Sequence, residues 1–334
     1  MSASLTRRAF TASALSALAA PASAQQLDKV SFGTNWVAEA EHGGFYQAVA
    51  DDTYKKYGLD VTIVPGGPQV NNRMLLLAGR IDFFMSANCL QSFDAVAQSI
   101  PVIAVSAIFQ KDPQVLLAHP GAAETFEDLK KLTLFVSSEG LQTYYKWMQA
   151  EFGFSESQTK PYTFNPQPFL VDRNSAMQGY VTSEPFAVEK AGVKPKIFLL
   201  ADQGFNTYST LIEARRETVE KRPDLVQRFV DASAIGWYNY LYRDNKAANE
   251  LIRKHNPEMS QELIDYSIAK MKEYGIVDSG DTLKDGIGAM SDAHMASFFD
   301  KMVKAGVIKP SVDFRRSYTL QFVNKGVGLE LRPK

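Results

Sequence analysis

Cysteine and histidine are scarce in this sequence of 334 residues. The single cysteine, Cys89, excludes an internal disulfide and a thiolate metal cluster. None of the four histidines is paired with another histidine, a cysteine or an acidic residue at metal-ligand spacing. We therefore predict no metal site. The histidines are His42, His119, His255 and His294.

Signatures of catalysis and of nucleic-acid binding are also missing. The sequence has no phosphate-binding loop, no dinucleotide-binding glycine pattern and no Gly-x-Ser-x-Gly nucleophile motif. There are 36 lysines and arginines against 37 aspartates and glutamates, which gives a formal net charge of -1. This balance provides no basic footprint for nucleic acid. We predict no catalytic residue, no cofactor and no nucleic-acid partner.

The N-terminal residues 1–24 have the pattern of an export signal. Two arginines precede a small, apolar, uncharged run over residues 11–20, and the Ala-Ser-Ala sequence at 22–24 suits a signal peptidase. The apolar run is too short to span a bilayer. We expect cleavage after this sequence and a periplasmic location. The arginine pair resembles a twin-arginine signal, and an ordinary Sec signal fits equally well.

The rest of the chain alternates short strand-like runs with helical ones. This alternation predicts βαβ units, mainly parallel sheets flanked by helices and an α/β fold. The elements expected first are Val30–Thr34, His42–Tyr57, Asp60–Val64, Asn71–Ala78, Ile81–Met85, Asn88–Ala97 and Val102–Phe109. A second unit follows with Thr133–Val136, Leu141–Phe152, Gly179–Thr182, Pro185–Ala191 and Ile197–Leu200. The amphipathic helices Pro223–Tyr242, Asn245–His255, Ser260–Tyr274 and Gly288–Lys304 complete the chain.

This order of elements predicts two lobes. Residues 25–118 and 206–334 would form the first lobe, and residues 119–205 the second. The chain would cross between them near 118–121 and again near 202–205. Ligands of open α/β sheets lie beyond the carboxyl ends of the strands, so we expect the ligand in the cleft between the lobes.

The segment after the first expected strand is the most informative. It contains Asn35-Trp36 and then His42, which opens a helix. This pattern resembles the entry motif of the thiamine-pyrimidine precursor-binding proteins, within the nitrate, sulfonate and taurine binding-protein superfamily. The stretches Tyr57–Val61, Leu77–Asp82 and Ser99–Val102 resemble further landmarks of that superfamily. The resemblance extends from about Val30 to about Tyr242.

The resemblance implies a type II periplasmic binding protein, the solute-binding part of an ABC importer. Its partners would be a small-molecule ligand and a membrane permease with its ATPase, and we expect a monomer without enzymatic activity. By the same resemblance Asn35 would hydrogen-bond the edge of a pyrimidine and Trp36 would stack on the ring. His42 would lie at the rim or contact the ligand. Packing between lobes for Trp36 and helix capping for His42 remain alternatives.

Two further strand ends are candidate walls of the site. Ser86 and Asn88 are polar where a strand meets the expected cleft, although either one would also serve as a helix cap. In the second lobe Ser137 and Ser138 offer hydroxyl groups to a polar ligand group. Cys89 is expected to be buried packing rather than a reactive thiol.

Tyr180 and Glu184 mark the other strand-to-helix turn of the second lobe. Some relatives that bind pyrimidines have a glutamate at this position. This resemblance implies that Glu184 accepts hydrogen bonds from an amino-substituted ring. An exposed charge at the helix start is the alternative for Glu184, and a place in the core is the alternative for Tyr180. Together with Glu139, this carboxylate argues against an anionic ligand such as nitrate, taurine or another sulfonate, which remains the second hypothesis.

An enzyme of the same fold is the third hypothesis. The fungal thiamine-pyrimidine synthase carries a cysteine-rich run and a helical histidine. The matching stretch Ala201–Leu211 has no cysteine and Asn88–Ala97 has no histidine. Binding is therefore favoured over catalysis.

Overall fold

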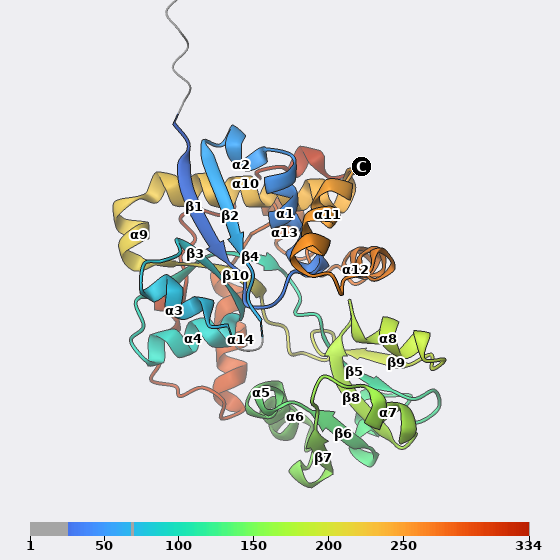
Figure 1. The fold of residues 1–334 in the computed structure, drawn as a ribbon. Helices are drawn as coiled ribbons and strands as arrows, with labels where there is room; N and C mark the ends of the chain where they lie inside the picture. The colour runs from blue at the N-terminus through green and yellow to red at the C-terminus, as the bar shows by residue number, and fades with distance from the viewer. Residues whose placement is uncertain (1–25, 68–69, 334) are drawn as a thin grey trace, which may run out of the picture.

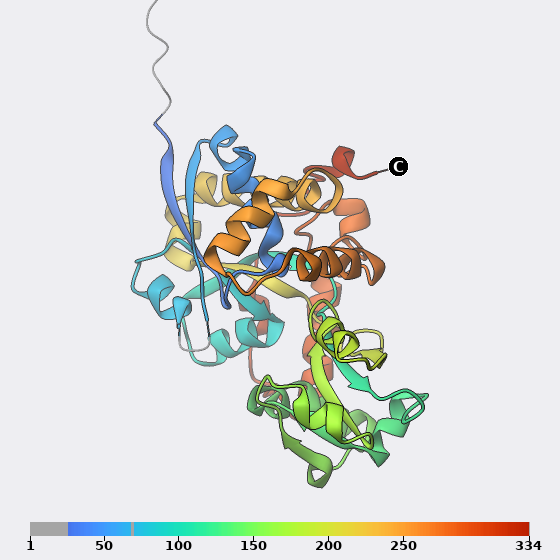
Figure 2. The same cartoon turned by 45° about the vertical axis from the view of Figure 1, so that its right-hand side comes forward.

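The chain folds into two lobes, each built on its own sheet. The structure is a computed structural model that describes residues 26–67 and 70–333. The expected export signal and its cleavage site lie outside these residues. Each lobe contains a five-stranded sheet with helices packed against it (Figure 1), and the two lobes remain distinct in the turned view (Figure 2). The predicted α/β fold class is confirmed.

The first sheet is mainly parallel. Its strands are, in spatial order, β2 (Leu59–Val64), β1 (Asp28–Gly33), β3 (Phe83–Asn88), β10 (Ser209–Arg215) and β4 (Val102–Phe109). β1 pairs in parallel with β2 and β3, whereas β10 is antiparallel to both of its neighbours. The carboxyl ends of β1, β3 and β4 therefore share one edge of the sheet.

The second sheet repeats this plan with one antiparallel strand. Its strands are, in spatial order, β7 (Thr159–Pro161), β6 (Thr133–Val136), β8 (Ser175–Tyr180), β5 (Gln114–Ala118) and β9 (Lys196–Leu199). β6 is parallel to β7 and β8, and β5 is antiparallel to β8 and β9. In both sheets the antiparallel strand is the one that enters from the other lobe.

These two antiparallel strands, β5 and β10, are absent from the sequence prediction. Because Gln114–Ala118 pairs with β8 and β9, the expected first crossing at 118–121 is wrong. The chain instead crosses at 110–113, and it returns at 200–208, a span that contains the expected 202–205. β5 follows β4 after only a short gap and is buried on both faces, so it lacks the period-2 pattern that marks a new strand.

Ten α-helices belong to the first lobe in the described chain, and four belong to the second. Those of the first lobe are α1 (Gly43–Ala50), α2 (Thr53–Lys56), α3 (Asn72–Leu77), α4 (Cys89–Ala97), α9 (Arg216–Lys221), α10 (Pro223–Tyr242), α11 (Lys246–His255), α12 (Gln261–Glu273), α13 (Thr282–Asp285) and α14 (Asp292–Lys304). Those of the second are α5 (Ser138–Gln142), α6 (Tyr144–Phe152), α7 (Gln167–Val171) and α8 (Glu184–Lys190). None of these helices combines the length and hydrophobicity of a membrane-spanning segment.

The helix expected over His42–Tyr57 is in fact broken. A short 3-10 turn (Ala40–His42) precedes α1, and the chain then bends before α2. Asp52 has a left-handed φ of 57°, which ends the regular helix. The Asp51 carboxylate accepts from the backbone N–H of Thr53 at 3.0 Å, a local hydrogen bond that stabilises the bend before α2.

Glycines allow α1 to pack closely on α10. A Cβ atom at Gly44 would lie 2.1 Å from the Trp237 ring, and one at Gly43 would lie 2.0 Å from the Tyr240 ring. On the opposite helix, a Cβ at Gly236 would lie 2.3 Å from the Gly44 carbonyl oxygen. This close approach fixes the segment before α1, which forms one wall of the cleft.

The two lobes touch on both sides of the cleft. On one side the Ser267 hydroxyl of α12 donates to the Thr182 carbonyl at 2.7 Å, and Figures 1 and 2 show α12 beside α8. On the other side Lys304 of α14 lies 3.0 Å from Glu151 of α6. The cleft is therefore bounded by direct contacts between the lobes.

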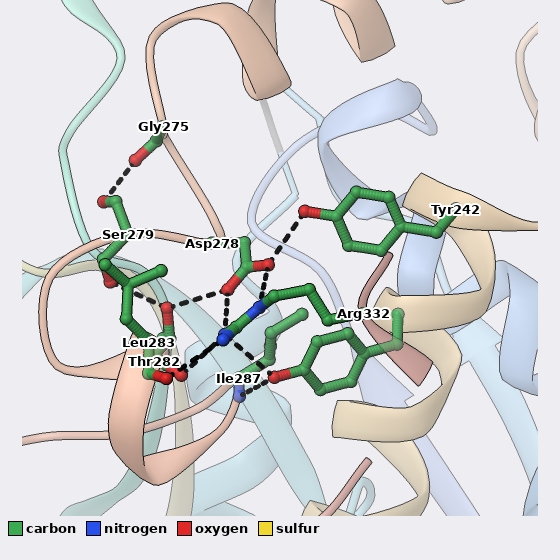
Figure 3. A network of polar contacts seen from close by, with 9 residues as sticks. Tyr242, Gly275, Asp278, Ser279, Thr282, Leu283, Ile287 and Arg332 are labelled. Atoms are coloured by element: carbon green, nitrogen blue, oxygen red, sulfur yellow. Dashed lines mark hydrogen bonds and ion pairs between the residues drawn. The ribbon is translucent and has the colours of Figure 1, made fainter. Parts of the chain in front are cut away.

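The C-terminal segment is fastened to the first lobe by one arginine. Arg332 donates from Nε to Asp278 Oδ2 at 2.8 Å and from Nη2 to Oδ1 at 2.6 Å (Figure 3). The Tyr242 hydroxyl of α10 donates to the same Oδ2 atom at 2.8 Å. This two-pronged pairing ties residues close to the C-terminus to α10 and to the loop before α13.

Candidate functional site

A cleft of about 350 Å³ lies between the lobes. The first lobe contributes the segments that follow β1 and β3, and the second lobe contributes those that follow β6 and β8. Residues of both crossings, the adjoining ends of β4 and β10, and Phe164 after β7 complete the lining. The cleft is thus where parallel strands of both sheets end, as expected for a ligand site in open α/β sheets.

Most residues singled out from the sequence come together here. Seven of them, from four separate segments of the chain, line the cleft. They are Asn35, Trp36, His42, Asn88, Ser137, Tyr180 and Glu184. Contact of each with a ligand stays a prediction.

Ser86 and Ser138 do not line the cleft. Met85 and Ala87 do, so Ser86 between them points to the opposite face of β3. Ser86 is fully buried there, beside Glu213. Ser138 lies on the exposed side of α5. Neither serine is in position to form a wall of the site.

Two of the lining residues also cap helices. Asn88 Oδ1 accepts from the Leu90 N–H at 3.0 Å, at the start of α4. Ser137 Oγ accepts from the Gly140 N–H at 3.1 Å, at the start of α5. The two roles proposed for Asn88, helix cap and site residue, are therefore compatible.

The lining is acidic. It contains five carboxylates, and none of the described residues that line the cleft is a lysine or an arginine. The carboxylates are Glu39, Glu41, Asp112, Glu139 and Glu184. Sequence reasoning assigned no role to Glu39, Glu41 or Asp112. Glu39 and Glu41 lie within the Asn35–Tyr46 segment, so that motif could have pointed to them. Asp112 lies in the first crossing, which the sequence analysis had placed at 118–121.

Burial raises the pKa of four of these carboxylates. It raises the pKa of Glu39 well above its ordinary value, and the nearby charges of Glu41 and Glu184 raise it further. The pKa values of Glu41 and Glu184 are also raised, mainly by burial. In the crossing, burial raises the pKa of Asp112 to about 6. The cleft therefore holds acidic groups whose charges lack sufficient compensation.

Glu184 is held firmly by its own lobe. Its Oε2 accepts from the Tyr180 N–H at 2.7 Å and from the Ser183 hydroxyl at 2.5 Å. These hydrogen bonds orient the carboxylate at the N-terminus of α8. Glu184 does lie in the first turn of α8, as the helix-start alternative expects, but it is half-buried in the cleft lining rather than exposed.

His42 is buried rather than at the rim, with 1% of its surface exposed. Burial lowers the pKa of His42 to about 3, so its ring is neutral near neutral pH. The Nε2 atom lies 3.6 Å from Glu39 Oε1. The Nδ1 atom is buried and has no hydrogen-bond partner within residues 26–67 and 70–333.

Aromatic rings from both lobes face the cleft. Trp36 of the first lobe and Phe164 of the second lie 5.9 Å apart between ring centroids, with 35° between their planes. Phe164 is 64% exposed and has a φ of 59°, which is unusual for a bulky residue. Deeper in the second lobe the Tyr144 hydroxyl donates to Gln178 Oε1 at 2.9 Å. Sequence reasoning missed Phe164, Tyr144 and Gln178.

Two chemical roles find no support at this site. Within the part of the chain that the structure describes, no group of three or more histidine, cysteine, aspartate or glutamate residues could hold a metal ion. Cys89 is buried, with Sγ 3.5 Å from Met295 Sδ. Burial raises the pKa of its thiol to about 12, so a nucleophilic thiolate is not available.

Two α/β lobes, joined by crossing strands and separated by a cleft, define the periplasmic binding-protein fold. Residues 39–248, more than half of the chain, match the NMT1/THI5 like family. The chain belongs to this family.

Individual relatives differ in what they do. The chain is 23% identical over 328 residues to the riboflavin-binding protein RibY of Chloroflexus aurantiacus, covering 94% of this chain and 92% of that protein. The periplasmic aliphatic sulphonate binding protein SsuA of Escherichia coli has a TM-score of 0.62 and 14% identity, covering 87% and 91% of the two chains. The desulfurization enzyme DSZB has a TM-score of 0.59 and 11% identity, covering 91% and 99%. Both structural likenesses show a shared fold.

Proposed function

We propose that this protein is the solute-binding component of an ABC importer and captures a flat, nitrogen-rich heterocycle, such as a thiamine pyrimidine precursor or a similar ring. Capture would occur by closure of the two lobes around the ligand. Membership of the NMT1/THI5 like family and the interlobe cleft support the binding role. Export to the periplasm, a permease with its ATPase as partner, and a monomeric state are parts of the same proposal.

The acidic lining of the cleft is the observation that favours a nitrogen heterocycle as the ligand. A buried carboxylate is costly unless it is paired with a donor or a cation. Amino and ring N–H groups of a nitrogen heterocycle provide such donors. An oxyanion would instead add negative charge beside Glu39, Glu41 and Glu184, where like charges already raise the pKa of Glu39.

Each wall of the cleft has a proposed role. Trp36 would stack on the face of the ring, with Phe164 closing over it from the second lobe. Asn35 and Glu184 would bind the ring edge, where Glu184 is already oriented by Tyr180 and Ser183. The loop that begins at Ser137 would hold a polar substituent.

The relatives favour two ligand classes. RibY is a riboflavin-binding protein, and riboflavin is a flat, nitrogen-containing ring system, which agrees with an aromatic cleft. SsuA binds aliphatic sulphonates, so a sulfonate, taurine or nitrate is the second candidate. The absence of lysine and arginine among the described lining residues disfavours that candidate, since oxyanion binding needs converging donors.

Catalysis is disfavoured for this chain, although DSZB is an enzyme of the same fold. A thiol reaction would require an accessible thiolate. Cys89 is instead packed against Met295 in the interior of the first lobe.

Calorimetry with aminopyrimidines, riboflavin, taurine, alkanesulfonates and nitrate tests the proposal. We expect an aminopyrimidine or a similar heterocycle to bind, and Trp36→Ala and Glu184→Gln each to weaken it by one to two orders of magnitude, about 1.5–3 kcal/mol. Glu189→Gln, an exposed charge on the same helix α8, is the matched control and should leave affinity unchanged. Tight binding of an oxyanion that Glu184→Gln leaves untouched would contradict the heterocycle proposal.

A further inference from the structure

Three carboxylates and a neutral histidine from both lobes lie near one another in the cleft lining. Glu39, Glu41 and His42 come from the segment before α1, and Glu184 comes from the start of α8. All four residues line the cleft. No lysine or arginine of the described residues forms an ion pair with any of these carboxylates, and the His42 ring beside Glu39 is neutral near neutral pH.

His42 cannot supply the missing positive charge, but it does offer an acceptor. A proton on Nε2 points toward the Glu39 carboxylate 3.6 Å away, whereas the other tautomer would place a lone pair against that carboxylate. With the proton on Nε2, the Nδ1 atom is a hydrogen-bond acceptor. This atom is buried in a side chain that is 1% exposed, and it has no partner within the described chain.

We infer that Glu39, Glu41, His42 and Glu184 form a cation subsite that binds a positively charged amine or ring nitrogen of the ligand. This inference rests on the proposed function and narrows its ligand class. A cation placed there would satisfy carboxylates of both lobes at once, and its N–H would find the free Nδ1 of His42. The Oε2 atom of Glu184 is already engaged by Tyr180 and Ser183, so its carboxylate is oriented before the ligand arrives.

A cation bound in this subsite would also favour closure of the two lobes. Glu39 and Glu41 belong to one lobe and Glu184 to the other, and the repulsion between their ionised forms across the cleft contributes to the raised pKa values of Glu39 and Glu41. A cation between them converts this repulsion into attraction from both sides. A neutral ligand of the same shape lacks that contribution and should bind more weakly.

Matched pairs of neutral and cationic probes test the subsite. The first pair is an aminopyrimidine with an aminomethyl group and the same ring with a hydroxymethyl group. The second pair, benzylamine and benzyl alcohol, carries the same difference without the heterocycle. We expect the cationic member of a pair to bind at least about tenfold tighter by calorimetry near neutral pH. Glu39→Gln should abolish this preference, and Glu189→Gln should preserve it.

The outcomes separate this inference from the proposed function. If both aminopyrimidines bind equally well, the cation subsite is overturned while the heterocycle proposal stands. If neither aminopyrimidine binds but benzylamine does, with a preference that Glu39→Gln removes, the subsite stands and the heterocycle proposal fails. If no probe binds, both are overturned. Glu41→Gln repeats the test at a second carboxylate, and thermal unfolding checks that each variant is folded.

Discussion

Buried or half-buried carboxylates occur in two regions of this molecule, and their surroundings differ. In the first lobe Glu213 of β10 is completely buried. Arg73 Nη2 of α3 lies 3.1 Å from both of its carboxylate oxygens, and the Ser92 hydroxyl of α4 donates to Oε1 at 2.8 Å. The fold itself therefore provides the cation and the donor that this carboxylate requires.

The carboxylates of the cleft receive much less. Glu184 has two donors from its own lobe, whereas Glu39 has a neutral histidine beside it. A folded protein normally pairs the charges it buries, because an unpaired one opposes folding. The difference indicates that the interior pair is part of the scaffold, and it agrees with the proposal that the cleft carboxylates bind a ligand.

The first prediction breaks the interior pair. Arg73→Met leaves Glu213 buried without its cation, so we expect the free energy of unfolding to fall by about 3–5 kcal/mol. Urea denaturation measures this loss. Glu213→Gln in the same chain removes the stranded charge and should restore much of the stability. A loss under about 1 kcal/mol for Arg73→Met would contradict the role of Arg73, because that is the size expected of an exposed pair.

The second prediction concerns the removal of the Asp112 carboxylate from the cleft. Burial raises the pKa of Asp112 from its ordinary 3.8 to about 6, and Asp112 is 3% exposed. Between these two values the folded state holds more protons than the unfolded state, so the contribution of Asp112 to stability falls as pH rises through this window. Asp112→Asn avoids the ionised form. We expect it to stabilise the ligand-free protein by about 1–3 kcal/mol near pH 7.5 and to have little effect near pH 4.

Urea denaturation of Asp112→Asn at the two pH values checks this sign. Asparagine keeps an oxygen that accepts from the Gln114 N–H, which lies 2.9 Å from Asp112 Oδ1, so the crossing retains this hydrogen bond. Asp300→Asn, at an exposed position of α14, is the control and should change the free energy of unfolding little at either pH. If Asp112→Asn destabilised the protein at both pH values, the carboxylate would be structural, like Glu213.

The third prediction concerns an ion pair that is exposed. Lys111 and Asp202 lie 2.9 Å apart, one on each crossing, with side chains 33% and 49% exposed. Water screens such a pair, so Lys111→Met should lower the free energy of unfolding by less than about 1 kcal/mol. The same urea denaturation gives the value. A loss comparable to that of Arg73→Met would mean that burial does not decide the worth of an ion pair in this protein.

Local patterns account for the parts of the fold that were predicted correctly. α10 was expected over Pro223–Tyr242 and has those bounds, because Pro223 suits a first helical turn and the apolar spacing persists along the whole segment. Thr125 and Asp128 likewise form a capping box with both of its hydrogen bonds, a pattern that a few neighbouring residues decide. Where a local signal was weaker the boundary moved: α14 begins at Asp292 rather than Gly288, after the cap supplied by Ser291.

The site was predicted in part for the same reason. Asn35, Trp36 and His42 belong to one short motif, so the sequence alone identified them as a group. Asp112 and Phe164 carry no local signal, because each gains its place only when the two lobes meet. The prediction that Ser86 lines the site was wrong. Successive side chains of β3 point to opposite faces of the sheet, and the sequence did not fix which of two neighbouring residues faces the cleft.

The sequence by itself determined the α/β alternation, the positions of most helices and the motif at the first strand end, since these depend on neighbours within a few residues. The tertiary structure alone decided the sheet to which β5 belongs, the antiparallel course of β10 and the gathering of acidic side chains in the cleft. Strand pairing brings together residues far apart in the chain. Electrostatic repulsion likewise couples distant residues such as Glu39 and Glu184. Such partners are set by packing and long-range electrostatics, which no local window of sequence contains.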